Sequence, residues 1–139
     1  MSAFYWAVLT AGIWGVVPLM EKLGLGQHPP AVGVVARSLG VVGGLLVFVM
    51  WRPPWAALRT LGWPSFLLLA GGGLLASLVG QLVFYHALKA GTVSQVTPVA
   101  GAYPLVAALL GWWLLREPLT LPRVVGVVCV VVGVILLRK

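Results

Sequence analysis

The chain has 139 residues, of which 61% are hydrophobic and only 8% are charged, and its mean hydropathy is +1.09. This composition excludes a soluble globular domain, which needs a charged surface, and indicates that lipid covers most of the molecule. The formal charge of +7 does not indicate nucleic-acid binding, because the basic residues stand singly or in pairs at the ends of apolar runs, as in membrane proteins.

Five apolar segments are long enough to cross a bilayer, whose hydrocarbon core of about 30 Å needs roughly 17 to 25 helical residues. They are residues 3–20, 31–51, 63–85, 93–115 and 121–137. We therefore predict an all-α integral membrane protein, a single unit of five transmembrane helices spanning residues 1–139. The apolar run at the start follows no basic side chain, so we expect the first span to remain in the mature protein.

The first span carries no charge, and Trp14 lies at its mid-depth, four residues before Pro18. Trp14 is a candidate wall for a pocket that binds an apolar or aromatic ligand, although core packing explains it equally well. The second span contains Arg37, about 9 Å from its start by helical rise. An intramembrane charge costs at least about 2.5 kcal/mol, so Arg37 either binds a carboxylate-bearing substrate or pairs with Glu21 at the end of the first span.

The third span ends in a polar stripe, because Ser77, Gln81 and Tyr85 are spaced four residues apart and so share a helical face. We expect Gln81 and Tyr85 to face a substrate cavity. His86 is a candidate proton site because its unperturbed side chain titrates near physiological pH, and an ordinary interfacial hydrogen bond is the alternative.

Small residues recur at helical spacing on the second and third spans. They are Ala36, Gly40 and Gly44 on the second span and Gly72, Ala76 and Gly80 on the third. Such stripes let membrane helices approach closely, so they predict a tightly packed bundle.

The fourth span contains two prolines, Pro98 and Pro104. Neither can donate to the carbonyl four residues earlier, so each frees an acceptor and bends the helix. Irregular backbone at membrane depth persists where it is buried in protein or lines an aqueous cavity. We therefore expect a broken helix that binds substrate through Gln95, Thr97 and Tyr103; a kink satisfied by neighbouring helices is the alternative.

The fifth span is rich in valine, with Gly126, Cys129 and Gly133 on nearly the same face. We predict that this face is the dimer seam. Cys129 is the single cysteine, and no cluster of Cys and His has the spacing of metal ligands, so we expect neither metal nor cofactor. The predicted spans contain neither a Ser/His/Asp set nor a pair of carboxylates, so we do not expect an enzyme.

Basic residues divide equally between the two faces if the spans alternate in direction. One face has Arg52, Arg59, Arg116 and Arg123, and the other has Lys22, Lys89, Arg138 and Lys139. Because an excess of Lys and Arg on the cytoplasmic side sets orientation, this tie predicts insertion in both orientations. We expect an antiparallel homodimer with ten helices, in which the second copy supplies an inverted repeat. A single orientation set by another feature is the alternative.

The sequence also resembles the EamA-type unit of the drug/metabolite transporter superfamily over nearly its whole length. The resemblance is carried by residues 14–24, by Arg37, by Tyr-x-Ala-Leu-Lys-x-Gly at 85–91 and by Arg-Glu-Pro-Leu-Thr at 116–120. Many members contain two such repeats; this chain resembles one repeat alone, as in the five-span bacterial and archaeal group. The resemblance implies small-molecule transport, often export, in the cell (inner) membrane of a prokaryote. Small multidrug resistance relatives use an acidic residue within the first span, which this chain lacks, so coupled export of organic cations is not expected.

We therefore expect a transporter of small polar or amphipathic metabolites such as amino acids. It would act by facilitated diffusion or weakly proton-linked export, through alternating access in the homodimer. Its partners would be the lipid bilayer, the small-molecule substrate and its own second copy. The alternatives are a membrane subunit that assembles or stabilises another protein without transporting anything, and one half of a heterodimeric transporter.

Overall fold

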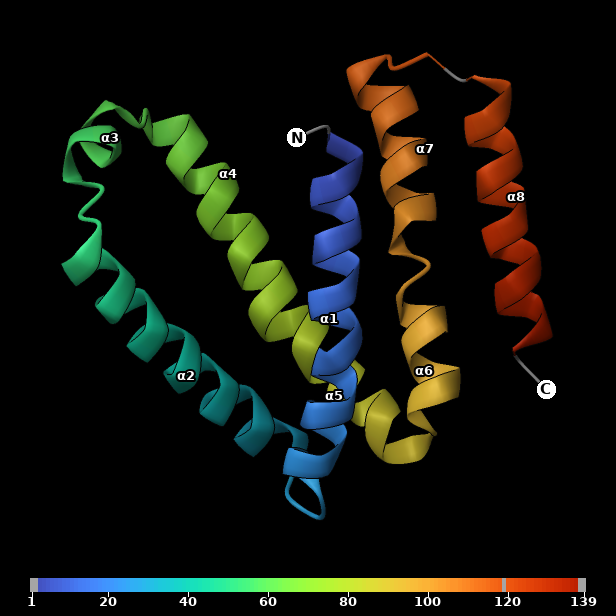
Figure 1. The fold of residues 1–139 in the computed structure, drawn as a ribbon, viewed down its shortest axis with the longest axis horizontal. Coiled ribbons are helices and arrows are strands. Elements are labelled where there is room, and N and C mark those ends of the chain that lie inside the picture. The colour runs from blue at the N-terminus through green and yellow to red at the C-terminus, as the bar shows by residue number, and fades with distance from the viewer. Residues whose placement is uncertain (1–2, 119, 138–139) are drawn as a thin grey trace. The chain divides into compact units, whose positions relative to one another are not determined.

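The computed structural model describes residues 3–118 and 120–137, and within these ranges the chain is helical without β-strands (Figure 1). Arg138 and Lys139, which entered the charge count above, lie outside the described residues. The helices are α1 (Ala3–Leu25), α2 (Pro30–Trp51), α3 (Trp55–Thr60), α4 (Trp63–Leu74), the π-helical segment η1 (Leu75–Gly80), α5 (Gln81–Ala90), α6 (Val93–Ala100), α7 (Tyr103–Leu115) and α8 (Leu121–Leu136). The chain divides into two units, residues 1–89 and residues 90–139.

Four helical segments among the described residues are long and apolar enough to cross a membrane. They are Phe4–Leu25, Pro30–Trp51, Trp63–Ala90 and Val93–Leu115. The apolar helix α8 is shorter, with 16 residues, and at 1.5 Å per residue it extends about 24 Å. The fifth span therefore stays a prediction, whereas the four longer segments are candidate spans by their length and composition.

Helix starts follow the local rules for proline. Pro30, Pro64, Pro104 and Pro122 occupy the first positions of α2, α4, α7 and α8, where a missing N–H costs no intrahelical hydrogen bond. The α7 helix ends at Leu115, and the residue that caps it, Arg116, adopts the left-handed conformation with φ of 53°. The backbone N–H groups of Arg116 and of the following residue both donate to the carbonyl of Gly111, which closes the helix end.

The helix α1 continues five residues past the predicted end of the first span. The prediction ended the span at the first charged residues, Glu21 and Lys22, whereas the helix runs to Leu25. Both charged side chains find partners on neighbouring segments of the first unit, so they do not interrupt the helix. Glu21 is therefore an intrahelical residue and not the end of a span.

The fourth predicted span is divided into α6 and α7 (Figure 1). The interruption lies at Gly101 and Ala102, between the two prolines. The N–H of Gly101 donates to the carbonyl of Thr97 at 2.7 Å, and that of Ala102 donates to the carbonyl of Val99 at 3.2 Å. The tightened last turn of α6 thus leads into a short turn before α7 begins.

Four buried side chains of the first unit lie where α1, α2 and α5 meet. Leu25, Val34, Tyr85 and Leu88 are buried there. At Gly33 on α2, an added Cβ would lie 2.7 Å from Tyr85 Cε2 and 2.8 Å from Leu25 Cδ1, so a larger residue fits only if these side chains shift. The predicted small-residue stripes behave differently, because a Cβ at Gly40, Gly44 or Gly72 meets no neighbouring atom within 4 Å among the described residues.

Candidate functional site

The polar centre of the first unit is the carboxylate of Glu21 on α1. Its Oε1 atom lies 3.3 Å from Nε of Arg37 on α2. The same oxygen accepts hydrogen bonds from Gln81 Nε2 at 2.8 Å and from the Tyr85 hydroxyl at 3.1 Å, both on α5. Three helices therefore converge on one carboxylate oxygen, and this Glu21 cluster comprises Glu21, Arg37, Gln81 and Tyr85.

The geometry of the helices places these side chains together. Gln81 and Tyr85 stand one turn apart on α5, so both side chains reach the same side. The π-helical segment η1 precedes them and contacts α2. Ser77 lies in η1 and is exposed, so the predicted polar stripe does not extend to it. Such π-helical turns inside membrane helices change the direction in which the following side chains face.

Burial makes the cluster energetically significant. The side chain of Glu21 is only 10% exposed and that of Arg37 is 33% exposed. A charge within a membrane-spanning helix is costly alone, so the ion pair and the two neutral donors stabilise both charges. The structure thus brings Arg37 and Glu21 together, which is one of the two arrangements that the sequence left open.

A cavity of about 290 Å³ borders the cluster on the side of the α1–α2 turn. Glu21 and Arg37 supply its charges, and Tyr85 closes one wall. The remaining lining residues are Gly24, Leu25, His28, Val32, Gly33 and Ala36. The cavity therefore combines one cation and one anion with mainly small or aliphatic walls, which suits a small amphipathic molecule.

Two lysines fix the ends of the helices around this cavity. Lys89 Nζ donates to the backbone carbonyls of Gln27 at 3.2 Å and His28 at 3.0 Å, in the α1–α2 turn. Lys22 Nζ donates to the carbonyl of Leu88. Since lysine ammonium groups satisfy carbonyls that the helix ends leave without partners, they hold the turn against α5.

The other predicted site residues of the first unit stand apart from the cluster. Trp14 is an exposed residue of α1 and does not line the cavity. His86 is exposed, and its Nδ1 donates to the carbonyl of Leu82 one turn earlier at 2.8 Å. A hydrogen bond of this kind is the ordinary one that the sequence left as the alternative to a proton site.

The predicted residues of the fourth span belong to the second unit. Gln95 on α6 and Tyr103 on α7 are exposed, whereas Thr97 is partly buried. The Oγ1 atom of Thr97 is buried and has no hydrogen-bond partner among the described residues. These side chains flank the interruption between α6 and α7, beside Pro98 and Pro104.

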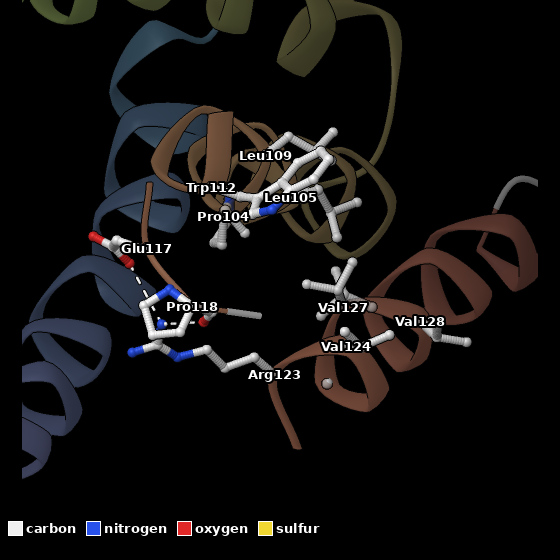
Figure 2. A pocket seen from close by; sticks show the side chains of 13 residues that line it. Pro104, Leu105, Leu109, Trp112, Glu117, Pro118, Arg123, Val124, Val127 and Val128 are labelled. Atoms are coloured by element: carbon white, nitrogen blue, oxygen red, sulfur yellow. Dashed lines mark hydrogen bonds and ion pairs between the residues drawn. The ribbon is translucent and has the colours of Figure 1, made fainter. Parts of the chain in front are cut away.

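A second cavity of about 650 Å³ lies between α7 and α8, within the second unit. Figure 2 shows Leu105, Leu109 and Trp112 of α7 on one side and Val124, Val127 and Val128 of α8 on the other. Polar groups enter at the α7–α8 connection, where Arg123 Nη1 lies 3.5 Å from Glu117 Oε2 and donates to the carbonyl of Pro118 at 3.1 Å.

The predicted dimer seam on α8 relates to this cavity only through Gly126, which lines it. Cys129 is exposed, and neither it nor Gly133 lines the cavity. Within residues 3–118 and 120–137, no group of three or more His, Cys, Asp or Glu side chains could hold a metal ion.

Two residues of this region were not selected as site residues from the sequence. Glu21 is the centre of the polar cluster, although it had been considered only as a partner for Arg37. The available signal was the position of Arg37, which lies about two turns from the start of α2, as Glu21 lies about one turn from the end of α1. Gly33 was not singled out because the pattern of small residues emphasised Gly40 and Gly44 instead.

The family model for the EamA-like transporter family matches residues 1–139. An uncharacterized protein of Methanocaldococcus jannaschii is 26% identical over 136 residues, which are 98% of this chain and 96% of that protein. An uncharacterized transporter in the cobO 3′ region of a Sinorhizobium species is 26% identical over 133 residues, which are 96% of this chain and 94% of that protein.

A Mycobacterium tuberculosis protein named alpha-(1->3)-arabinofuranosyltransferase is 33% identical over 125 residues. These residues are 82% of this chain but only 8% of that protein, so its name describes a much larger molecule. No solved structure matches the chain significantly.

Proposed function

The chain belongs to the EamA-like transporter family, and from this premise we propose that it transports small zwitterionic metabolites, foremost neutral aliphatic amino acids. The observation that carries the proposal is the ion pair of Arg37 and Glu21 at the edge of a small cavity. An amino acid has a carboxylate for Arg37 and an ammonium group for Glu21. The aliphatic walls at Leu25, Val32 and Ala36 suit its side chain.

The geometry of the pair supports exchange with a substrate. The separation of 3.3 Å between Arg37 Nε and Glu21 Oε1 is longer than the roughly 2.8 Å of a strong charge-assisted hydrogen bond. A guanidinium group binds a carboxylate best through two parallel N–H donors. A substrate carboxylate that makes such a bidentate contact can therefore replace Glu21, which Gln81 and Tyr85 continue to hold.

Charge balance favours a zwitterion over a singly charged molecule. Breaking a buried ion pair while leaving one charge without a partner costs about 3–5 kcal/mol, and each 1.4 kcal/mol is a factor of ten. Arg37 is one third exposed, so solvent reduces this cost. We expect a discrimination of about 10- to 100-fold against a matched acid or amine, because either would leave one member of the pair uncompensated.

Transport by alternating access would use the whole assembly. The equal numbers of basic residues on the two faces support insertion in both orientations, and an antiparallel homodimer would then combine two inverted copies. Trp14, Gln95, Thr97 and Tyr103 are proposed to contact the substrate during this cycle. Facilitated diffusion or weakly proton-linked export, with His86 as the proton site, agrees with the lack of an acid in the first 20 residues. The bacterial and archaeal relatives support a prokaryotic cell membrane as the location.

Uptake into proteoliposomes tests this function. The panel comprises radiolabelled leucine, 4-methylpentanoate and isopentylamine, which share an aliphatic group and differ in their charges. Leucine flux should exceed the flux of the acid and the amine by about 10-fold or more. Arg37→Lys should lower leucine flux about 10-fold, because an ammonium group cannot make the bidentate contact.

The matched control is Arg59→Lys on the exposed helix α3, which keeps the charge count and should leave the flux unchanged. Wild-type fluxes equal to those of empty vesicles across neutral amino acids would contradict these molecules as substrates. Equal loss of flux in the two lysine variants would remove the proposed role of Arg37.

A further inference from the structure

We propose that the cavity between α7 and α8 is a binding site for one anionic phospholipid, with an acyl chain between the two helices and its phosphate at Arg123. This site lies wholly within the second unit and is independent of the proposed substrate site at Glu21. If the site exists, the headgroup composition of the membrane determines which lipid binds to this protein.

The size and the lining of the cavity fit a lipid chain. Its volume of about 650 Å³ lies within the range of about 300–1,000 Å³ that is typical of ligand sites. Leu105, Leu109 and Trp112 of α7 face Val124, Val127 and Val128 of α8 across it (Figure 2). Helix α7 lies in a segment long enough to cross the bilayer, so the medium that enters such a cavity is hydrocarbon.

The polar end of the cavity fits a headgroup. The charged lining groups, Glu117 and Arg123, both come from the α7–α8 connection or the first turn of α8. The ring of Trp112 lines the cavity near this end, at the kind of depth where tryptophan meets the headgroup region. An amphipathic molecule would thus bind with its apolar part along the helices and its polar part at Arg123.

The charge at this end favours an anionic headgroup. The charged lining groups, Glu117 and Arg123, balance each other, and the neighbouring Arg116, which does not line the cavity, gives residues 116–123 a formal net charge of +1. The ion pair of Arg123 and Glu117 spans 3.5 Å, with side chains that are 58% and 54% exposed. Such an exposed pair contributes only about 0–1 kcal/mol, so a phosphate can compete for Arg123.

A second copy of the chain is a poorer occupant. A helix with a diameter of about 10 Å occupies roughly 120 Å³ per residue at 1.5 Å rise, so the cavity would hold fewer than two turns of it. A second copy also carries the same formal charge of +7, whereas an anionic lipid opposes it. Cys129 lies outside the cavity, so the predicted seam on α8 does not require this space.

Native mass spectrometry of the purified protein tests the proposal. The protein in detergent is incubated with equimolar dioleoyl phosphatidylglycerol and dioleoyl phosphatidylcholine, and the retained lipid is counted. We expect one tightly retained lipid per chain, with phosphatidylglycerol favoured about fivefold, as about 1 kcal/mol per basic side chain predicts. Arg123→Gln should abolish this preference, and Glu117→Gln should increase it. The control Arg59→Gln should leave it unchanged.

A matched pair of variants tests the location of the acyl chain. Ala108 lines the cavity and its neighbour Ala107 does not. Ala108→Trp should reduce retention of both lipids at least fivefold, whereas Ala107→Trp should retain them as the wild type does. Equal retention of the two lipids by the wild type, or an unchanged preference in Arg123→Gln, would overturn the proposal. Lipid retention that Ala108→Trp leaves unchanged would overturn it as well. So would the finding that only Ala108→Trp prevents dimer formation while the amount of bound lipid stays the same.

Discussion

Replacement of Gly33 by alanine should disrupt the Glu21 cluster through a single methyl group. The new Cβ would lie 2.7 and 2.9 Å from two ring carbons of Tyr85 and 2.8 Å from Leu25 Cδ1. Both neighbours are buried, and the Tyr85 ring cannot move without stretching its hydrogen bond to Glu21. Overpacking of this kind costs about 1–3 kcal/mol. Alanine in a helix recovers about 0.5–1 kcal/mol relative to glycine, so the net destabilisation is about 0–2.5 kcal/mol.

The matched control is Gly43→Ala on the same helix, where an added Cβ meets nothing within 4 Å. This variant should be about 0.5–1 kcal/mol more stable than the wild type. Because the helix-propensity gain is common to both variants, their difference of about 1–3 kcal/mol isolates the clash. Unfolding in mixed micelles, followed by the fluorescence of the seven tryptophans, measures it. Leucine flux should fall in Gly33→Ala only. Equal stabilities of the two variants would refute the packing described for α1, α2 and α5.

Tyr85→Phe removes one donor to the Glu21 carboxylate and should lower the free energy of unfolding by about 1.5–3 kcal/mol. The control Tyr5→Phe, at an exposed position, should change it by less than about 0.5 kcal/mol. Similar unfolding curves for the two variants would contradict the hydrogen bond. Arg116→Gly should stabilise the protein by about 1 kcal/mol by removing a left-handed non-glycine residue, and a loss of stability in the same unfolding assay would oppose this. Reporters fused at the C-terminus should find both orientations in the wild type and mainly a cytoplasmic C-terminus in Arg59→Gln. The variant has three basic residues on one face of the membrane and four on the face of the C-terminus. A single orientation in both proteins would contradict insertion governed by equal numbers of basic residues.

The membrane architecture could be predicted from the sequence because its physical cause is local. Apolar runs of sufficient length and prolines at helix starts act within one segment, so four of the predicted segments overlap the long apolar helices at α1, α2, α4 to α5 and α6 to α7. The boundary of α1 was wrong for a non-local reason. Glu21 ended the predicted span as a charged residue, and only contacts from α2 and α5 make its place inside the helix favourable.

Packing between helices was less predictable. Small residues at fourfold spacing predicted close approach along Gly40 and Gly44, but the closest approach is at Gly33, opposite the ring of Tyr85. The sequence shows which small residues would allow two helices to approach closely. The rotation of the helices relative to each other decides at which of these residues they do so. For the same reason, Arg37 and Tyr85 were selected individually, but their common partner Glu21 emerged only from the arrangement of three helices.

The most direct test of the proposed site compares the substrate preferences of Glu21→Gln and Arg37→Gln in proteoliposomes. Each variant leaves one charge of the pair in a cavity that is otherwise unchanged. Glu21→Gln should now favour 4-methylpentanoate over leucine, because the carboxylate alone neutralises Arg37. Arg37→Gln should favour isopentylamine, because the ammonium group alone neutralises Glu21. Preferences that stay at leucine in both variants, or that shift in the same direction, would contradict a substrate that bridges Arg37 and Glu21.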